Sequence, residues 1–317
     1  MKTQFLITAC ILSLSAGLAA CGNNTNSSAE KVDAVKSRAN PAPTAAEIAK
    51  GNHYSPSTGV TYPTRVYWGD THLHTNLSQD AFTFGVTLGP EESYKFAKGE
   101  PVKATHGEIA QLARPLDFLV VADHAEGLGA MQALMDGNET MLKSERLRGW
   151  RKDILASKNA ADLQKVAMDG INNGWPEELG DPIIKGSAWK YQTDIADRHN
   201  TPGTFTALIG YEWTSWPGGS NLHRVVIFKD DAKKTQQVLP FSRDDSPKPE
   251  DLWKFLDGYE KKTGGSALAI PHNGNLSNGL LFPLLAEDGN PLSDEYLKAM
   301  EPLAVNCFFF FFFVFYA

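Results

Sequence analysis

Cysteine is scarce in this chain, which contains three cysteines among 317 residues. Cys10 lies in an N-terminal apolar segment that is typical of a cleaved secretory signal, so we expect it to leave with that segment. Cys21 and Cys307 then remain. Two cysteines, of which one is predicted below to carry a lipid, cannot build a disulfide framework. The sequence therefore excludes a small secreted scaffold held together by disulfides.

The chain also lacks an excess of basic residues. It has 30 Lys and Arg against 37 Asp and Glu, and its formal net charge is −7. There is no basic block, so nucleic acid is not a predicted partner. Internal repeats are absent as well. The part of the sequence after about residue 50 is long enough for one large core or two small ones.

Residues 1–20 are predicted to be a lipoprotein signal peptide. Their apolar part is short and ends in small residues, which argues against a membrane-spanning helix. Small residues directly before Cys21 match the lipobox of bacterial lipoproteins, with an ordinary signal and a chance cysteine as the alternative. Gly22, rather than an acidic residue, follows, as in lipoproteins of the outer membrane. Residues 21–50 are predicted to be a flexible tether. We therefore expect a protein on the periplasmic side of the envelope, anchored through lipid on Cys21.

Residues 307–317 form a phenylalanine-rich tail. Phe308–Phe313 are six consecutive phenylalanines, a run too short to span a membrane and prone to aggregation if exposed. We expect a frameshift or sequencing artefact here, with the natural protein continuing past about Asn306.

Several short apolar runs adjoin residues that can bind a metal ion. These are Arg65–Trp68 before His72 and His74, Asp117–Ala122 before Asp123 and His124, Phe205–Gly210 before Glu212, the run opened by His223, and Ala267–Ile270 before His272. Continuous apolar runs of this length suit strands buried on both faces, as in parallel sheets. Ligands at the ends of several strands are the arrangement that a (β/α) barrel uses for its active site.

Helical patterns lie between these runs, which predicts an α/β fold. The predicted helices are Pro90–Ala97, Gly107–Ala113 and Pro249–Lys262. A longer, mostly helical segment at about residues 127–200 is interpreted as an insertion that covers the strand ends. It is either a lid or a surface decoration. Three further histidines, His53, His106 and His199, are predicted to be surface residues.

The ligand types favour a multinuclear metal site. Divalent metals take imidazole nitrogen and carboxylate oxygen, and alternation along a strand points His72 and His74 the same way, so both can bind one ion. Asp80 can reach a neighbouring ion, and Glu212 can bridge two ions. One histidine at a strand end is usually structural, but five segments that each offer a ligand are hard to explain in that way.

Three residues beside these ligands are candidates for other roles. Asp123 is the catalytic candidate, because it can orient His124 or a metal-bound water. Arg224 can hold a phosphate or carboxylate as a fork, and a surface or inter-strand arginine is the alternative. Asn273 either donates to the substrate or forms a turn.

Four stretches, YWGDTHLHTNLSQDAF, RPLDFLVVADHAEGLG, FTALIGYEWTSWPGGSNLHRVVIF and AIPHNGNLSNG, resemble domain-of-unknown-function family 3604. That family is placed in the PHP (polymerase and histidinol phosphatase) superfamily. The resemblance runs over roughly Val66 to Val305. It implies a distorted (β/α)7 barrel within residues 51–306, a centre of two or three zinc, manganese or iron ions, and phosphoesterase activity.

The resemblance also implies the ligands one at a time. His72 and His74 match the first H-x-H pair, and Asp80 matches the position six beyond it, where the superfamily has a histidine or an acid. His124 matches the D-H motif and Glu212 the bridging glutamate, and the two later histidines of the superfamily correspond to His223 and His272. The late D-x-H motif of the superfamily is absent after His272. We therefore expect this chain to bind metal weakly and to have little activity.

The leading hypothesis is a metal-dependent hydrolase that uses a metal-bound hydroxide on a small phosphorylated substrate. Hydrolysis of an amide, ester or lactone on the same metal site is an alternative. A non-catalytic binding lipoprotein of the cell envelope is another.

Overall fold

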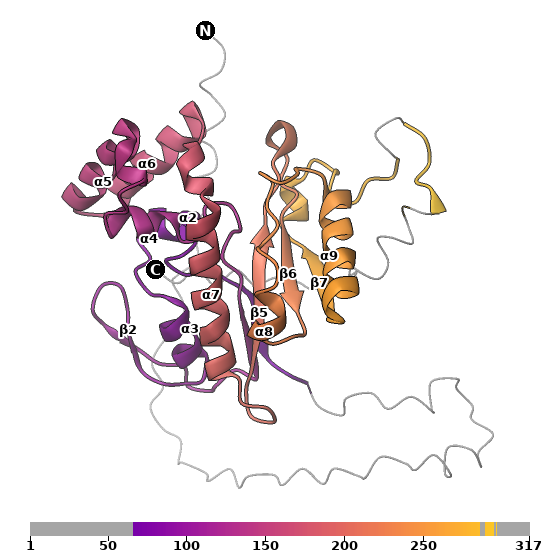
Figure 1. The fold of residues 1–317 in the computed structure, drawn as a ribbon. Coiled ribbons are helices and arrows are strands. Elements are labelled where there is room, and N and C mark those ends of the chain that lie inside the picture. Colours follow the sequence, from indigo (N-terminus) through magenta and orange to yellow (C-terminus); the bar gives the residue numbers. More distant parts are fainter. Residues whose placement is uncertain (1–65, 286–288, 295, 297–317) are drawn as a thin grey trace, which may run out of the picture. The chain divides into compact units, whose positions relative to one another are not determined.

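The computed structural model describes residues 66–285, 289–294 and 296, all within the compact unit Val66–Ala317 (Figure 1). The predicted signal peptide and tether, including Cys21, lie outside the described residues, as do His53 and the phenylalanine-rich tail. No helix among the described residues is both long and apolar enough to cross a membrane.

Five strands form one mixed sheet in the order β1-β4-β5-β6-β7. They are β1 (Gly69–Leu73), β4 (Phe118–Val121), β5 (Thr206–Trp213), β6 (Arg224–Phe228) and β7 (Ala267–Pro271). Four of the five predicted apolar runs contain strands, namely β4, β5, β6 and β7. The fifth run, Arg65–Trp68, precedes its strand, because β1 begins at Gly69 and includes His72. The alternation of strands and helices confirms the predicted α/β class. Among the described residues the sheet is open, and a closed barrel is not observed.

The direction of β6 differs from that of the other strands. β1, β4 and β5 pair in parallel, but β6 is antiparallel to both β5 and β7. The expectation of parallel strands is therefore wrong for β6. A parallel connection needs a crossover of about a dozen residues or more, and the loop between Trp213 and Arg224 is too short for one.

Three helices cover one face of the sheet. They are α3 (Pro90–Ala97), α7 (Pro182–His199) and α9 (Pro249–Thr263). In α9, Leu252, Leu256 and Tyr259 are spaced three or four residues apart and are buried against the strands. The structure confirms the predicted Pro90–Ala97 helix and ends α9 one residue beyond its predicted end.

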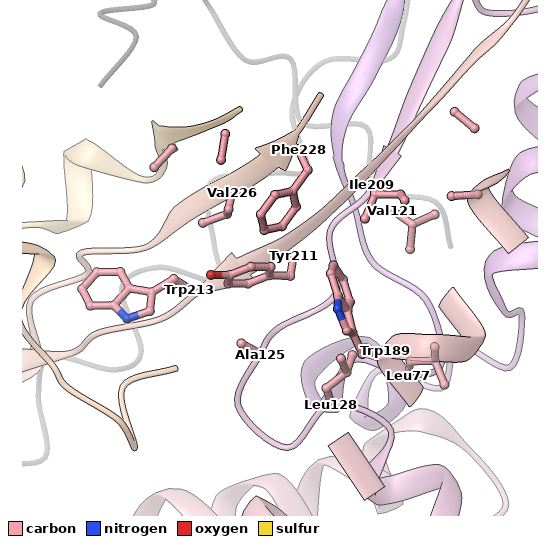
Figure 2. Close-up of a cluster of buried hydrophobic side chains, with 14 of the residues drawn as sticks. Leu77, Val121, Ala125, Leu128, Trp189, Ile209, Tyr211, Trp213, Val226 and Phe228 are labelled. Atoms are coloured by element: carbon pink, nitrogen blue, oxygen red, sulfur yellow. The ribbon is translucent and has the colours of Figure 1, made fainter. Parts of the chain in front are cut away.

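The main core lies between these helices and the sheet. Figure 2 shows Trp189 of α7 beside Tyr211 and Phe228, and its ring centroid is 5.9 Å from that of Tyr211. Position 210 requires glycine because β4 and β5 approach each other closely there. A Cβ on Gly210 would lie 2.5 Å from Val120 Cγ1. Because Ile209 and Tyr211 face the main core, the alternating positions Leu208, Gly210 and Glu212 face the other side of the sheet.

That second face carries a cluster made of side chains from the strand segments alone. Val120, Ala122, Val225 and Ile227 are buried there, and Leu208, Leu268 and Ile270 pack against them. Glu212 stands at one edge of the same face.

The predicted helix at Gly107–Ala113 is not formed. Instead, β2 (Val102–Lys103) and β3 (Ile109–Ala110) pair as a short antiparallel hairpin. Gly107 has φ of 101° in the turn, a conformation that favours glycine and interrupts a helix.

The segment between β4 and β5 is mostly helical, as predicted. It contains α4 (Ala130–Met135), the 3₁₀ turn η2 (Met141–Lys143), α5 (Glu145–Ala156), α6 (Ala160–Asn173), the 3₁₀ turn η3 (Glu177–Gly180) and α7. The part before α7 has its own apolar cluster, which includes Met131, Leu147 and Trp150. α7 contributes Ile184 to this cluster and Trp189 and Ile195 to the main core, so the helix joins the two.

His199, at the end of α7, is buried, and its prediction as a surface residue is wrong. Its Nε2 lies 3.1 Å from Glu91 Oε2, and its ring stacks on Tyr94 with centroids 5.5 Å apart. His106 is exposed, as predicted.

Candidate metal centre

The seven candidate ligands come together at one edge of the sheet. This edge contains the carboxyl ends of β1, β4, β5 and β7 and the amino end of β6. His223 precedes its strand, whereas the other ligands lie at or after strand ends, and the antiparallel direction of β6 explains this difference. The backbone N–H of His272 donates to the carbonyl of His223 at 2.9 Å, which holds these two segments together.

Glu212 is the central residue of this cluster and is fully buried. Its Oε2 lies 2.7 Å from Nε2 of both His72 and His74, and its Oε1 lies 2.8 Å from Nδ1 of His223. Burial alone would raise the pKa of Glu212. The charge of His124 and the hydrogen bonds from His223 and His72 outweigh burial and hold that pKa well below its usual value.

Asp80 joins two more histidines to the cluster. It lies in the first turn of α2 (Gln79–Thr83), 3.1 Å from His74 Nδ1 and 3.5 Å from His124 Nε2. Burial opposes ionisation of Asp80, but the charges of His74 and His124 hold its pKa well below the usual value. Burial alone would lower the pKa of His124, yet Glu212 and Asp80 raise it to about 9.

Two histidines of the cluster, His223 and His272, are held toward the neutral form, because burial lowers the pKa of each. Burial and the neighbouring His72 lower the pKa of His272 to about 3. The centroids of these two rings are 3.8 Å apart. A neutral imidazole has a free lone pair and is the form that binds metals.

The donor atoms form three groups, each with its atoms within 4.8 Å of one another. The groups are His72, Glu212 and His272; His74, Asp80 and His124; and His124, Glu212 and His223. Glu212 and His124 each belong to two groups, so these side chains could hold more than one metal ion. His72 and His74, expected to bind one ion, fall in different groups, although their Nε2 atoms are 3.2 Å apart.

Asp123 contacts a residue that the sequence did not single out. Its two carboxylate oxygens accept from the backbone N–H of Thr75 at 2.5 Å and from the Thr75 hydroxyl at 2.7 Å. Burial raises the pKa of Asp123 to about 6, and His74 and Thr75 partly offset that rise. Asp123 therefore ties the turn after β1 to the end of β4, rather than orienting His124 directly.

Two hydroxyl groups, also missed in the sequence, position the ligands. Ser78 donates to Asp80 Oδ1 at 2.6 Å and accepts from the His124 backbone N–H at 3.2 Å. Thr214 Oγ1 lies 2.5 Å from His124 Nδ1. Serine and threonine after a strand are common, so their residue types gave no signal.

Glu126 is a further buried carboxylate beside the cluster. Its Oε1 accepts from the backbone N–H groups of Thr214 and Arg243 at 3.2 and 2.8 Å. Its Oε2 is buried without a hydrogen-bond partner, 4.0 Å from His124 Nδ1, and burial raises its pKa.

Arg224 points away from the cluster. Glu212 pairs in register with Val225, so Arg224 faces the opposite side of the sheet. Its guanidinium carbon lies 5.8 Å from the centroid of the Trp253 ring on α9, and burial lowers its pKa to about 10. The structure favours the inter-strand alternative over a phosphate-binding role.

Asn273 directly follows His272 and is half-buried. Its backbone is left-handed, with φ of 57°, at the start of the 3₁₀ turn η5 (Gly274–Leu276). This geometry fits the turn-forming alternative and keeps Asn273 beside the cluster.

A cavity of about 950 Å³ lies apart from the candidate ligands, between α3, α4, α7 and the β2–β3 hairpin. Asn76, Gln132 and Tyr191 are among the residues that line it, and none of the seven candidate ligands does.

These observations define a mixed α/β domain with a buried cluster of histidine and carboxylate side chains at one sheet edge, a candidate metal-binding protein. The chain matches the model of the family described as "Protein of unknown function (DUF3604)" over residues 61–304, and it belongs to that family. No curated protein and no solved structure matches the chain.

Proposed function

We propose that this protein is a metal-dependent hydrolase that acts on a small phosphoester. The observation that supports this proposal best is the position of Glu212. This buried carboxylate lies within 2.8 Å of ring nitrogens of His72, His74 and His223. A carboxylate with both oxygens directed at imidazoles suits the bridge between two metal ions.

The donor set fits two or three ions of the zinc, manganese or iron type. All seven donors are imidazole or carboxylate groups, and no thiolate is among them. Bound ions would supply Lewis acidity and lower the pKa of water, which is the chemistry that hydrolyses esters near neutral pH. The protein contributes the fixed positions of the ligands, through Asp123, Ser78 and Thr214.

The choice of a phosphoester rests on the resemblance of the ligand motifs to the PHP superfamily. We propose the distorted (β/α)7 barrel of that superfamily as the complete fold. The strand-only cluster on the second face of the sheet supports this proposal, because the inner face of a barrel packs strand side chains against one another.

We also propose a lipid anchor on Cys21 that holds the protein on the periplasmic side of the outer membrane. This proposal rests on the sequence before Cys21. Replacement of Cys21 by alanine is expected to move the protein from the membrane fraction to the soluble fraction. Retention of the variant in membranes would contradict the proposal.

The activity is tested by metal analysis of the purified chain and by a panel of phosphomonoesters and phosphodiesters. We expect weakly bound metal and a low but measurable rate of hydrolysis in the wild type, and loss of both in Glu212→Gln. Glu139→Gln is the matched control, because Glu139 is exposed. Absence of metal, or hydrolysis that is equal in wild type and Glu212→Gln, would contradict the proposed function.

A further inference from the structure

A large aromatic side chain stands exposed directly beside the candidate metal centre. Trp216, in the loop between β5 and β6, has 52% of its surface exposed. Its ring centroid lies 5.7 Å from that of His223, with the planes at 65°. Single exposed apolar residues are common on protein surfaces. Because its exposed ring contacts a candidate ligand, Trp216 lies at the surface directly beside the centre.

The loop that carries Trp216 is held in place on both sides of this residue. The buried Ser215 donates from its hydroxyl to the Pro247 carbonyl at 2.7 Å, and its own carbonyl accepts from Leu222 N–H at 3.0 Å. After Trp216, the Ser220 N–H donates to the Pro217 carbonyl at 3.0 Å, and Gly218 and Gly219 have φ of 57° and 85°, values that favour glycine. The indole is therefore presented from a fixed loop.

The segment after β7 brings a second exposed apolar residue close to the Trp216 loop. The backbone N–H of Asn221 donates to the Leu276 carbonyl at 3.0 Å, and the Asn278 amide donates to the Ser220 hydroxyl at 3.0 Å. These bonds join the Trp216 loop to the segment that begins with His272. Leu276, in η5, is 55% exposed.

We infer that Trp216 and Leu276 form a subsite for a flat, apolar group of the substrate, next to the metal centre. The inference rests on the proposed function and names its substrate class: a phosphoester whose organic group is aryl or similarly planar. An indole ring gains most from stacking with another ring, and an exposed leucine adds apolar contact. A small alkyl group would gain little from either residue.

Two phosphonates that cannot be hydrolysed test this subsite, phenylphosphonate and methylphosphonate. They share the same anionic group and differ in the organic group alone. By calorimetry on the metal-loaded chain, we expect phenylphosphonate to bind about tenfold more tightly than methylphosphonate, the scale of one aromatic stacking contact. Trp216→Ala is expected to remove most of this preference without changing the affinity for methylphosphonate. Trp216→Phe should keep part of it.

Trp68→Ala is the matched control. Trp68 is 60% exposed and precedes β1, at the opposite end of that strand from His72. We expect this variant to keep the full preference. Circular dichroism on each variant checks that the fold is retained.

The subsite and the proposed hydrolysis fail in different ways. If the preference is present and depends on Trp216 but no phosphoester is hydrolysed, the proposed function is wrong and the subsite stands. Equal affinity for the two phosphonates, no binding of either, or a preference unchanged in Trp216→Ala overturns the subsite, even if phosphoesters are hydrolysed.

Discussion

Nε2 of His72 lies 2.7 Å from Oε2 of Glu212, a residue 140 positions later in the chain. The two side chains meet because β1 and β5 both pair in parallel with β4, so their carboxyl ends lie at the same edge of the sheet. Burial of a carboxylate is unfavourable unless it is paired. In the absence of metal, His74 and His124, whose pKa values are raised, supply positive charge beside Glu212.

Metal binding is therefore expected to depend steeply on pH. His74 has a pKa well above its usual value, and that of His124 is about 9. Below these values an incoming ion must displace a proton, so affinity rises as pH rises. We expect zinc affinity to increase by about tenfold per pH unit between roughly pH 6 and 9 for each proton displaced. Zinc titrations at three pH values measure this slope, and a flat profile would contradict metal binding through His124.

Asp123→Asn is expected to weaken metal binding although Asp123 is not in any ligand group. The substitution replaces one of the two oxygens that accept from Thr75 by an amide N–H₂, so the turn that bears His74 is less well held. Loss of such a supporting contact lowers metal affinity by about 10- to 100-fold. The measurement is the zinc dissociation constant by competition with a chelator.

Asp117→Asn is the control for that experiment. Asp117 Oδ2 accepts from the Trp68 backbone N–H at 2.8 Å, so it also joins β1 to β4, but at the other end of the strands. We expect a loss of stability without a change in zinc affinity. Equal losses of zinc affinity in both variants would indicate general loosening of the sheet instead of a positioning role for Asp123.

Arg224→Met is expected to leave phosphate binding unchanged. The side chain packs against Trp253 on the face away from Glu212, and methionine can fill a similar volume there. Because the Arg224 Nε is buried without a hydrogen-bond partner, we expect the unfolding free energy to change by no more than about 1 kcal/mol. Calorimetric titration with inorganic phosphate and thermal melting measure the two effects. A tenfold loss of phosphate affinity would restore the substrate-binding role.

Six of the seven candidate ligands were predictable because each lies beside an apolar run, and Asp80 was predictable from its position six residues after His74. The direction of β6 and the side of the sheet on which Arg224 lies were not predictable, because both depend on the register of β6 with β5. The role of Asp123 was hidden for a similar reason. Its partner Thr75 lies 48 residues away, in a turn whose threonine resembles any other.

The packing of the helix at residues 182–199 was also not predictable from the sequence. The pattern in residues 182–199 is helical, but it does not tell whether the helix packs on the sheet or on its neighbours in the insertion. The structure places Trp189 and Ile195 in the main core. His199 at the end of that helix is buried as a result, and its charged partner Glu91 comes from α3.

His199→Ala is expected to destabilise the protein far more than His106→Ala. The buried His199 ring stacks on Tyr94, and its Nε2 lies 3.1 Å from Glu91, whose pKa is lowered in part by this contact. Removal of the ring loses the stacking and leaves a cavity, for an expected cost of about 2 kcal/mol. His106 is exposed, and its replacement should change stability by less than about 0.5 kcal/mol. Urea unfolding of the two variants compares these values. Equal midpoints would mean that α7 does not pack on α3 in solution as it does in this structure.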